Sequence, residues 1–139
     1  MTVSIREASS GDRTAVIALW QECDLTRPWN DPVGDFDRAL AFAGSAIIVA
    51  DEESVVGTAM TGFDGHRGWI YYLGVKPTRR GEGIARRLTE ACANWLKQHD
   101  CPKVELMLRD GNPASGLYER LGWELQPVRV YARRLQDGE

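Results

Sequence analysis

Apolar residues recur along this chain at two different spacings, which predict two kinds of element. Alternating or continuous apolar runs between turn residues predict β-strands, and apolar residues three or four apart predict helices. We expect strands over residues 2–6, 46–50, 55–63, 69–75 and 104–108, with two more short strands within 123–134. We expect helices beginning after residues 9–12, and over 35–42, 81 to about 99, and 113–121.

Several element boundaries have local chemical signals. The run from Ser9 to Asp12 resembles a capping box and predicts the start of the first helix. Pro28 and Pro32 interrupt the pattern after that helix, so we expect a loop there. The helix from 81 to about 99 is strongly amphipathic, with one stripe made of Ile84, Ala85, Leu88, Ala91, Cys92, Trp95 and Leu96.

The predicted order of elements is β-α-α-β-β-β-α-β-α-β-β. Three consecutive strands joined by hairpins and followed by β-α-β give a mixed sheet, whereas a doubly wound parallel sheet would alternate strands and helices throughout. The 139 residues contain no repeat, linker or low-complexity tract, so we expect one α/β (α+β) domain over 1–139.

Composition narrows the class of partner. The chain is 43% hydrophobic and 27% charged with a formal net charge of −3, which disfavours disorder and a nucleic acid partner. No apolar run is long enough to span a bilayer. The three cysteines, Cys23, Cys92 and Cys101, have no metal-binding spacing. We therefore expect a cytoplasmic protein with no metal and no membrane contact.

The turn after the 69–75 strand is the main candidate for a binding site. It is basic, contains Gly81 and Gly83, and opens the longest predicted helix. Backbone N–H groups and the positive end of a helix dipole favour a bound anion, most plausibly a pyrophosphate. A P-loop would require Gly-Lys-Ser/Thr, but Ile84 follows Gly83, and Arg86 occupies the third glycine position of a dinucleotide fingerprint. The alternative is a plain glycine turn at a helix start.

The same turn resembles the phosphate signature of the GNAT superfamily of acyl-coenzyme A-dependent N-acyltransferases, Arg/Gln-x-x-Gly-x-Gly/Ala. Arg80, Gly83 and Ala85 match that signature, and residues 118–123 match the family's Tyr-x-x-x-Gly-Phe-like pattern. Element order and length also fit, so the resemblance covers nearly the whole chain. It implies a mostly antiparallel central sheet with helices on both faces.

The resemblance also implies acetyl-coenzyme A as the acyl donor. The strand residues Leu73, Gly74 and Val75 would hold its pantetheine arm, and its phosphates would meet Arg80, Gly81, Glu82, Gly83, Ile84 and Ala85. The family often places Asn where this chain has Gly111. Asn112, one residue later, either contacts the cofactor through a shifted loop or caps the helix beginning at Pro113.

By the same resemblance, a backbone N–H near Leu73 or Val75 would stabilise the oxyanion, and a bulge there would admit the donor beside the 104–108 strand. Tyr118 would be the general acid and would contact the cofactor; the alternative is a tyrosine that only packs or hydrogen-bonds the sulfur. Asp64 and His66 are the first candidates for a general base, by residue type and position near the acceptor side.

Trp29, Asn30 and Asp31 lie in the loop that borders the acceptor pocket in the family; the alternative is a proline-bounded loop anchored by a buried tryptophan. The loop and the 64–68 turn resemble the bacterial YpeA group, which is similar to ribosomal-protein alanine acetyltransferases. The expected function is acetyl transfer to a primary amine of a protein N-terminus, a lysine or a small molecule, with a homodimer possible. The alternative is a non-catalytic acyl-coenzyme A-binding sensor or interaction module.

Overall fold

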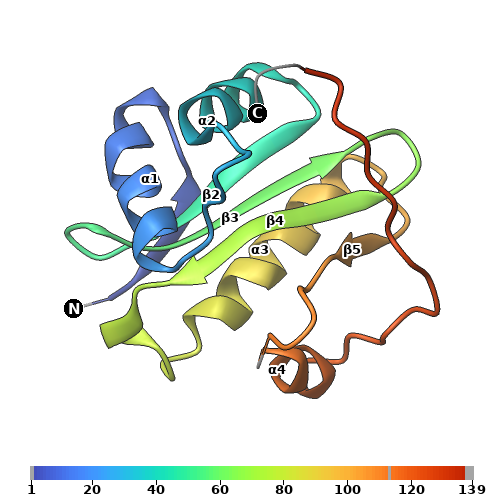
Figure 1. The fold of residues 1–139 in the computed structure, drawn as a ribbon. Coiled ribbons are helices and arrows are strands. Elements are labelled where there is room, and N and C mark those ends of the chain that lie inside the picture. The colour runs from blue at the N-terminus through green and yellow to red at the C-terminus, as the bar shows by residue number, and fades with distance from the viewer. Residues whose placement is uncertain (1, 113, 137–139) are drawn as a thin grey trace. The chain divides into compact units, whose positions relative to one another are not determined.

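The computed structural model describes residues 2–112 and 114–136, which divide into two compact units, 1–107 and 108–139. The first unit contains ten elements in the order β1 (Ser4–Glu7), η1 (Ser10–Asp12), α1 (Arg13–Glu22), α2 (Pro32–Ala41), β2 (Ser45–Asp51), β3 (Val55–Phe63), β4 (Gly68–Val75), η2 (Pro77–Arg79), α3 (Ile84–Gln98) and β5 (Val104–Leu106). The second contains α4 (Ser115–Arg120). Figure 1 shows the ribbon with these labels.

The five strands form one sheet in the order β1-β2-β3-β4-β5. The first three pairings are antiparallel, and only β4 and β5 are parallel, joined through the α3 crossover. The predicted mixed, mostly antiparallel sheet is therefore confirmed. The β3 strand was predicted with the bounds it has, Val55–Phe63, and the other predicted strands of this unit differ at their ends by one or two residues.

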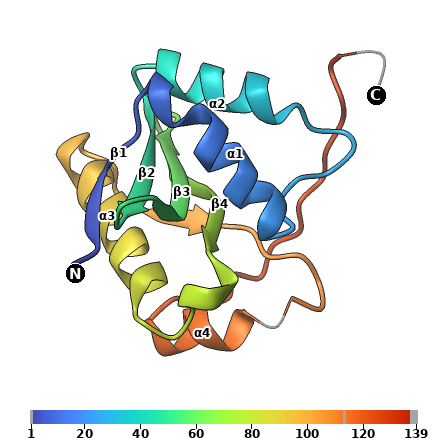
Figure 2. The same cartoon turned by 90° about the vertical axis from the view of Figure 1, so that its left-hand side faces the viewer.

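Helices cover both faces of the sheet, as predicted. Figure 2 shows α1 and α2 on one side of the strands and α3 on the other. The first face is filled by Val16, Trp20, Phe36, Ala39, Ile47 and Val49, all buried. On the opposite face α3 approaches β3 and β4 closely, because a Cβ at Gly57 would lie 2.9 Å from Leu88 and one at Gly68 2.8 Å from Leu96. These two glycines allow α3 to pack against the sheet.

The second helix begins earlier than the sequence predicted. We expected residues 35–42, whereas α2 runs over Pro32–Ala41. Pro32 stands in the first turn, where a backbone N–H has no helical carbonyl to bond. Proline therefore loses no helical hydrogen bond there, and its fixed φ is already helical. Proline therefore ends the preceding loop here and also starts the helix.

The two strands predicted within 123–134 were wrong for the described residues, because 123–136 contain no helix or strand. The apolar side chains that suggested them are exposed: Leu125 is 91% exposed and Tyr131 90%. A strand is stabilised by a paired neighbour and a buried face. The short apolar pattern of this segment has neither, so the local alternation does not decide its conformation.

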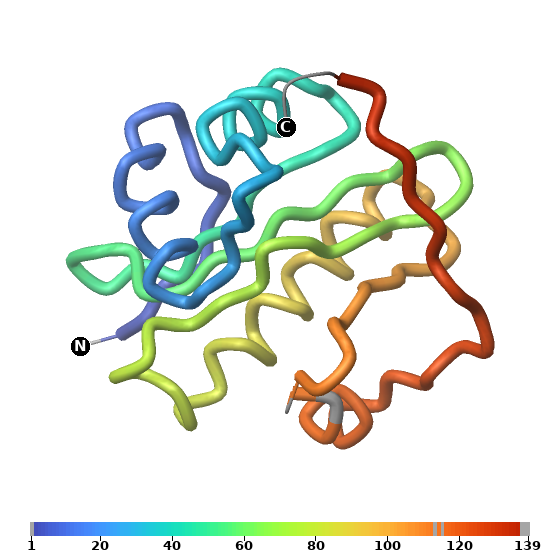
Figure 3. Tube along the Cα trace, viewed as in Figure 1, coloured from blue at the N-terminus to red at the C-terminus, as the bar shows by residue number. Residues whose placement is uncertain are grey.

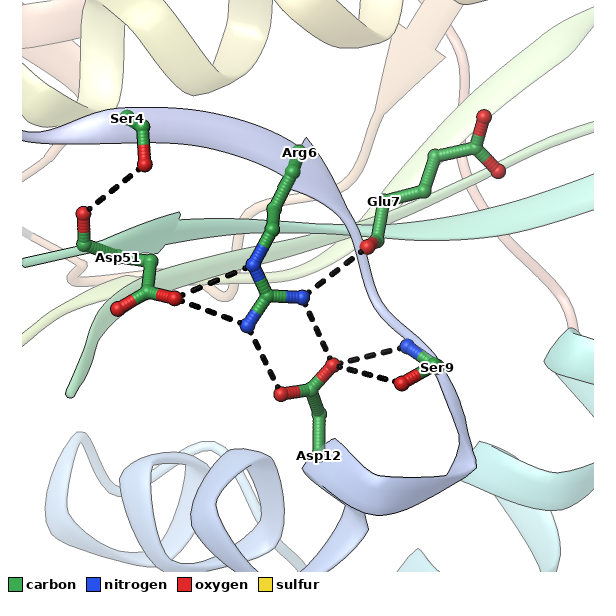
Figure 4. Close-up of polar contacts among 6 residues, drawn as sticks. All are labelled: Ser4, Arg6, Glu7, Ser9, Asp12 and Asp51. Carbon is green, nitrogen blue, oxygen red and sulfur yellow. Dashed lines mark hydrogen bonds and ion pairs between the residues drawn. The ribbon is translucent and has the colours of Figure 1, made fainter. Parts of the chain in front are cut away.

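One charged cluster ties β1, η1 and β2 together (Figure 4). The Arg6 guanidinium donates to both carboxylate oxygens of Asp12 at 2.9 Å and to Asp51 Oδ2 at 3.0 Å. The backbone N–H of Ser9 donates to Asp12 Oδ2 at 2.8 Å, as in the predicted capping box. These contacts hold the pKa of Asp12 at about 2, with the Arg6 hydrogen bond as the largest cause.

Replacing Asp12 with Asn should lower the free energy of unfolding at pH 7 by about 1–2 kcal/mol, because it removes a cap and one partner of Arg6. The folded-state pKa lies below the ordinary Asp value of 3.8, so Asp12 stabilises the fold above that value. The contribution disappears as the pH falls from about 4 to about 2, and urea melts of wild type and variant should converge there.

Asp37→Asn is the control, since Asp37 is 52% exposed and pairs only with Arg13 among the ion pairs of the described residues. A constant gap down to pH 2 would contradict the assignment.

Candidate functional site

The central strand β4 contains a bulge. Thr58 pairs with Gly74 and Met60 pairs with Tyr71, so Tyr72 and Leu73 together face the single residue Ala59. Tyr72 has φ 52°, in the left-handed region that non-glycine residues rarely adopt. The expected irregularity near Leu73 is therefore present. As a result, the side chains of the consecutive residues Tyr71 and Tyr72 both lie on the α1–α2 face.

The edge of β4 beyond the bulge is not used for strand pairing by the described residues. Pairing with β5 ends at Ile70 and Leu106. The Lys76 N–H donates to Val56 O at 2.8 Å, which fixes the hydrogen-bonding side of this stretch. Gly74 lies two residues before Lys76 and pairs with Thr58. Because hydrogen-bonding groups alternate sides along a strand, the carbonyl of Gly74 also faces β3. In the trans peptide that follows, the N–H of Val75 points the opposite way, toward the open edge.

β4 runs directly into the glycine turn and then into α3, and Figure 3 traces this path from lime green to yellow. Gly81 has φ 84° and Gly83 has φ 82°, and a Cβ at either would meet nothing within 4 Å. The first α3 hydrogen bond joins Arg87 N–H to Gly83 O, at 3.2 Å. The amides of Ile84 and Ala85 therefore lie in the first turn, where no helical carbonyl is available to them. The turn therefore leads into a helix start of the predicted kind, and phosphate binding there stays a prediction.

The charged side chains of the turn have protein partners. Arg79 pairs with Glu82 at 3.0 Å and with Glu52, in the β2–β3 hairpin, at 3.1 Å. The Arg80 Nε donates to the carbonyl of Val75 at 3.2 Å. Arg80 thus folds back along the open edge of β4, and Glu82 helps to fix the turn.

An aromatic and acidic cluster that no sequence pattern had indicated lies beside the bulge. The Tyr72 ring stacks on the buried Trp20, with centroids 3.8 Å apart, and Trp20 Nε1 donates to Thr58 Oγ1 at 3.4 Å. The Tyr72 hydroxyl donates to Asp35 Oδ2 at 2.7 Å. Asp35 Oδ1 accepts from Arg38 at 2.6 Å. Burial, and next the Asp35 contact, raise the pKa of Tyr72 above its ordinary value.

An open groove of about 710 Å³ adjoins this cluster. Its apolar walls include Ala39, Ala41, Phe42, Met60, Tyr71 and Tyr72. Its polar residues are Asn30, Asp35, Arg38 and Ser45. Of the three loop residues predicted to border an acceptor pocket, Asn30 lines the groove and contacts Tyr72. Trp29 is 40% exposed, and Asp31 lies at the N-cap position of α2.

Asp64 and His66 lie in the β3–β4 turn, at the end of β4 opposite the glycine turn. Asp64 Oδ1 accepts from the backbone N–H groups of His66 and Arg67, at 2.8 Å each, and these bonds lower the pKa of Asp64. Leu73 is the fifth residue after Gly68, which begins β4. Five steps along a strand correspond to about 17 Å. The structure does not bring these two candidate bases to the bulge.

The second unit contains Asn112 and Tyr118. Asn112 Oδ1 accepts from the Ala114 N–H at 2.8 Å, an Asx-turn contact that precedes α4, whose N-cap residue is Ala114; Pro113 lies outside the described residues. Tyr118 packs edge to face with Trp123, with centroids 6.0 Å apart. Burial raises the pKa of Tyr118 to about 12, so its phenol keeps its proton at neutral pH.

Among the described residues, no three His, Cys, Asp or Glu side chains are grouped so that they could hold a metal ion. None of the helices in the described part of the chain has the length and apolar character needed to cross a membrane.

A family model described as acetyltransferase (GNAT) family matches residues 10–123. The match includes β4, the glycine turn, α3 and the Tyr118 motif. The chain belongs to the GNAT acetyltransferase family. This match assigns the family, and the YpeA-like subgroup stays a prediction.

Among curated proteins, this GNAT chain is 42% identical to the acetyltransferase YE1169 of Yersinia enterocolitica, over 135 residues and 96% of each protein. Its fold is shared by solved structures that include the following two. A predicted acetyltransferase from Clostridium acetobutylicum with acetyl-CoA is 20% identical, with a TM-score of 0.80 over 95% of this chain and 96% of that one. AAC(6')-Iy in complex with a CoA-linked acetylneamine bisubstrate analogue is 19% identical, with a TM-score of 0.83 over 96% of this chain and 99% of that one.

Proposed function

We propose that this protein transfers an acetyl group from acetyl-CoA to a primary amine of a protein N-terminus, a lysine or a small molecule. The observation that carries the proposal is the bulged β4, whose open edge leads straight into the glycine turn of α3. The fold neighbours determined with acetyl-CoA and with a CoA-linked analogue support the choice of donor.

In this proposal the donor lies along the open edge of β4. The backbone of Leu73, Gly74 and Val75 holds the pantetheine arm. The pyrophosphate meets the amides of the glycine turn, with Arg80 beside it, as helix starts favour anions. Asn112 contributes the nitrogen of its side-chain amide to the donor, since its oxygen already accepts from Ala114.

The proposed reaction is direct attack. The neutral amine forms a bond to the thioester carbonyl carbon, the C–S bond breaks, and the thiolate takes a proton from Tyr118. The Val75 N–H, directed toward the open edge, stabilises the oxyanion. The amine gives its ammonium proton to water before the attack and a second proton to water after it, and solvent returns a proton to Tyr118. For an α-amine with a pKa of 7.7–8.0, deprotonation at pH 7 costs only about 1–1.5 kcal/mol, against about 4–5 for a lysine. No direct transfer to Asp64 or His66 is included, because about 17 Å of strand separates their turn from the bulge.

The loop containing Trp29, Asn30 and Asp31 borders the acceptor, and its sequence is the reason for proposing a YpeA-like subgroup. We propose a cytoplasmic enzyme, active as one domain over 1–139, with a homodimer as its possible assembly.

A thiol-release assay tests the proposed function. The purified protein is incubated with acetyl-CoA and a panel of peptides and small amines, and free CoA and acetylated amine are measured together. The proposal expects both products in equal amounts with at least one amine. Tight acetyl-CoA binding without turnover on any amine would instead identify a non-catalytic acyl-CoA binder.

Gly83→Ala should weaken acetyl-CoA binding about tenfold, since a Cβ at φ 82° strains the backbone that presents the α3 amides. Gly65→Ala is the matched control. Gly65 also has φ 95° and open space around it, but it lies in the β3–β4 turn. Both variants should lose a similar amount of stability, and calorimetry should find weaker acetyl-CoA binding only for Gly83→Ala. Equal affinities in the two variants would remove the glycine turn from the donor site.

A further inference from the structure

The groove beside the bulge carries an inference about the acceptor, which rests on the proposed function. It adjoins the β4 segment where that proposal places the thioester. The bulge turns Tyr71 and Tyr72 toward the same face, so two adjacent aromatic rings form the wall of the groove nearest the reacting edge. Without the extra residue, side-chain alternation would turn one of them to the α3 face.

Asp35 is the only carboxylate that lines the groove among the described residues. It lies in the first turn of α2, with its side chain 24% exposed, and Tyr72 and Arg38 each occupy one of its oxygens. A carboxylate oxygen has two acceptor positions, so both oxygens retain capacity for another donor. Tyr72 fixes the carboxylate rigidly, because its own ring is stacked on Trp20.

The remaining wall is mostly apolar. Ala39, Phe42 and Met60 line it, and apart from Arg38 its remaining polar residues are Asn30 and Ser45. Most hydroxyl groups of an amino sugar would lack partners along such a surface. A polyamine would need several carboxylates, whereas here a single one already has Arg38 beside it. The groove therefore suits an amine with an uncharged apolar body.

We infer that this groove binds the acceptor as an apolar primary amine, and that Asp35 selects it by accepting a hydrogen bond from its ammonium group. Asp35 is thus a specificity-determining residue. Arg38 competes with the ammonium group for the same carboxylate. Arg38 is 68% exposed at its side chain and can swing into solvent when the acceptor enters.

The competition gives a test that a purely structural ion pair would not pass. Asp35→Asn keeps the size of the side chain and an oxygen for Tyr72, yet removes the charge. It should raise the acceptor KM about tenfold or more and leave the acetyl-CoA KM nearly unchanged. Arg38→Ala removes the competitor and should lower the acceptor KM by about two- to fivefold. A structural pair would be broken equally by both variants, and both would then change KM in the same direction.

Two further variants complete the experiment. Asp37→Asn is the matched control on the same helix; Asp37 pairs with Arg13 and is 52% exposed, and its kinetics should equal those of wild type. Tyr72→Phe keeps the stacked ring and removes only the hydroxyl, so the acceptor KM should rise less than in Asp35→Asn. Thermal melts of all four variants show whether they are folded.

The acceptor panel compares phenethylamine with glucosamine and spermine. We expect phenethylamine to have an acceptor KM at least about tenfold lower than that of either. A preference for glucosamine or spermine, or acceptor KM values for Asp35→Asn and Arg38→Ala that shift together, would overturn the inference while leaving acetyl transfer intact. Failure of the proposed function would be different, because no amine would then release CoA from any variant, wild type included.

Discussion

Replacing Tyr118 with Phe should lower kcat about 100-fold or more, while acetyl-CoA binding changes little. The phenol is the proposed proton donor for the departing thiolate, and general acid catalysis contributes about 10²- to 10⁴-fold. Burial raises its pKa to about 12, so the acid form is present throughout the neutral range. The wild-type rate should therefore not fall on the alkaline side until the pH approaches that value.

Tyr131→Phe is the matched control for this variant. Tyr131 belongs to the same 108–139 unit and is 90% exposed, and its loss should leave kcat unchanged. The measurement is steady-state kinetics with saturating acetyl-CoA and amine, with donor affinity determined separately by calorimetry. Wild-type kcat in Tyr118→Phe would leave Tyr118 with a packing role only.

Replacing Trp20 with Ala should lower the free energy of unfolding by about 3–5 kcal/mol, the usual cost of removing a large buried aromatic side chain. Trp20 is fully buried, stacks on Tyr72 and lies 6.4 Å from Phe36 between ring centroids. Its indole N–H also donates to the buried Thr58 hydroxyl. The variant removes the support beneath the bulge as well as core volume.

Urea unfolding followed by circular dichroism measures this effect. The midpoint should fall while the slope with urea stays the same, since the surface exposed on unfolding changes little. Trp20→Phe retains an aromatic ring and should cost clearly less than Trp20→Ala. A loss below about 1 kcal/mol in Trp20→Ala would contradict a central packing role for this residue.

The main elements were predictable from the sequence because their signals are local. The Val55–Phe63 strand is an apolar run between turns, and α3 has an unbroken apolar stripe, so both were found close to their observed bounds. Residues 123–134 have a similar local pattern, but the prediction of two strands there was wrong. Strand formation depends on a partner strand that the local pattern does not specify. Pro32 was assigned to a loop since proline breaks helices, yet it starts α2.

The site was predictable only where it consists of backbone. Gly81 and Gly83 marked the turn because glycine is the residue that adopts a positive φ without cost. The bulge was expected only from the family resemblance. Tyr72 itself gives no local signal for it, since its φ of 52° is held by tertiary contacts with Trp20 and Asp35. Asp35 was seen only as the start of a helix. Asp64 and His66 were chosen for their residue types and for a position near the acceptor side, but they lie in the turn at the opposite end of β4 from the glycine turn.

A crystal structure of the protein with bound CoA tests the central claim most directly. We expect the pyrophosphate at the backbone amides from Gly81 to Ala85 and the pantetheine arm paired with the open edge of β4 near Val75. We expect the sulfur within hydrogen-bonding distance of the Tyr118 hydroxyl. CoA bound elsewhere, or a β4 edge covered by another strand of the chain in that complex, would contradict it.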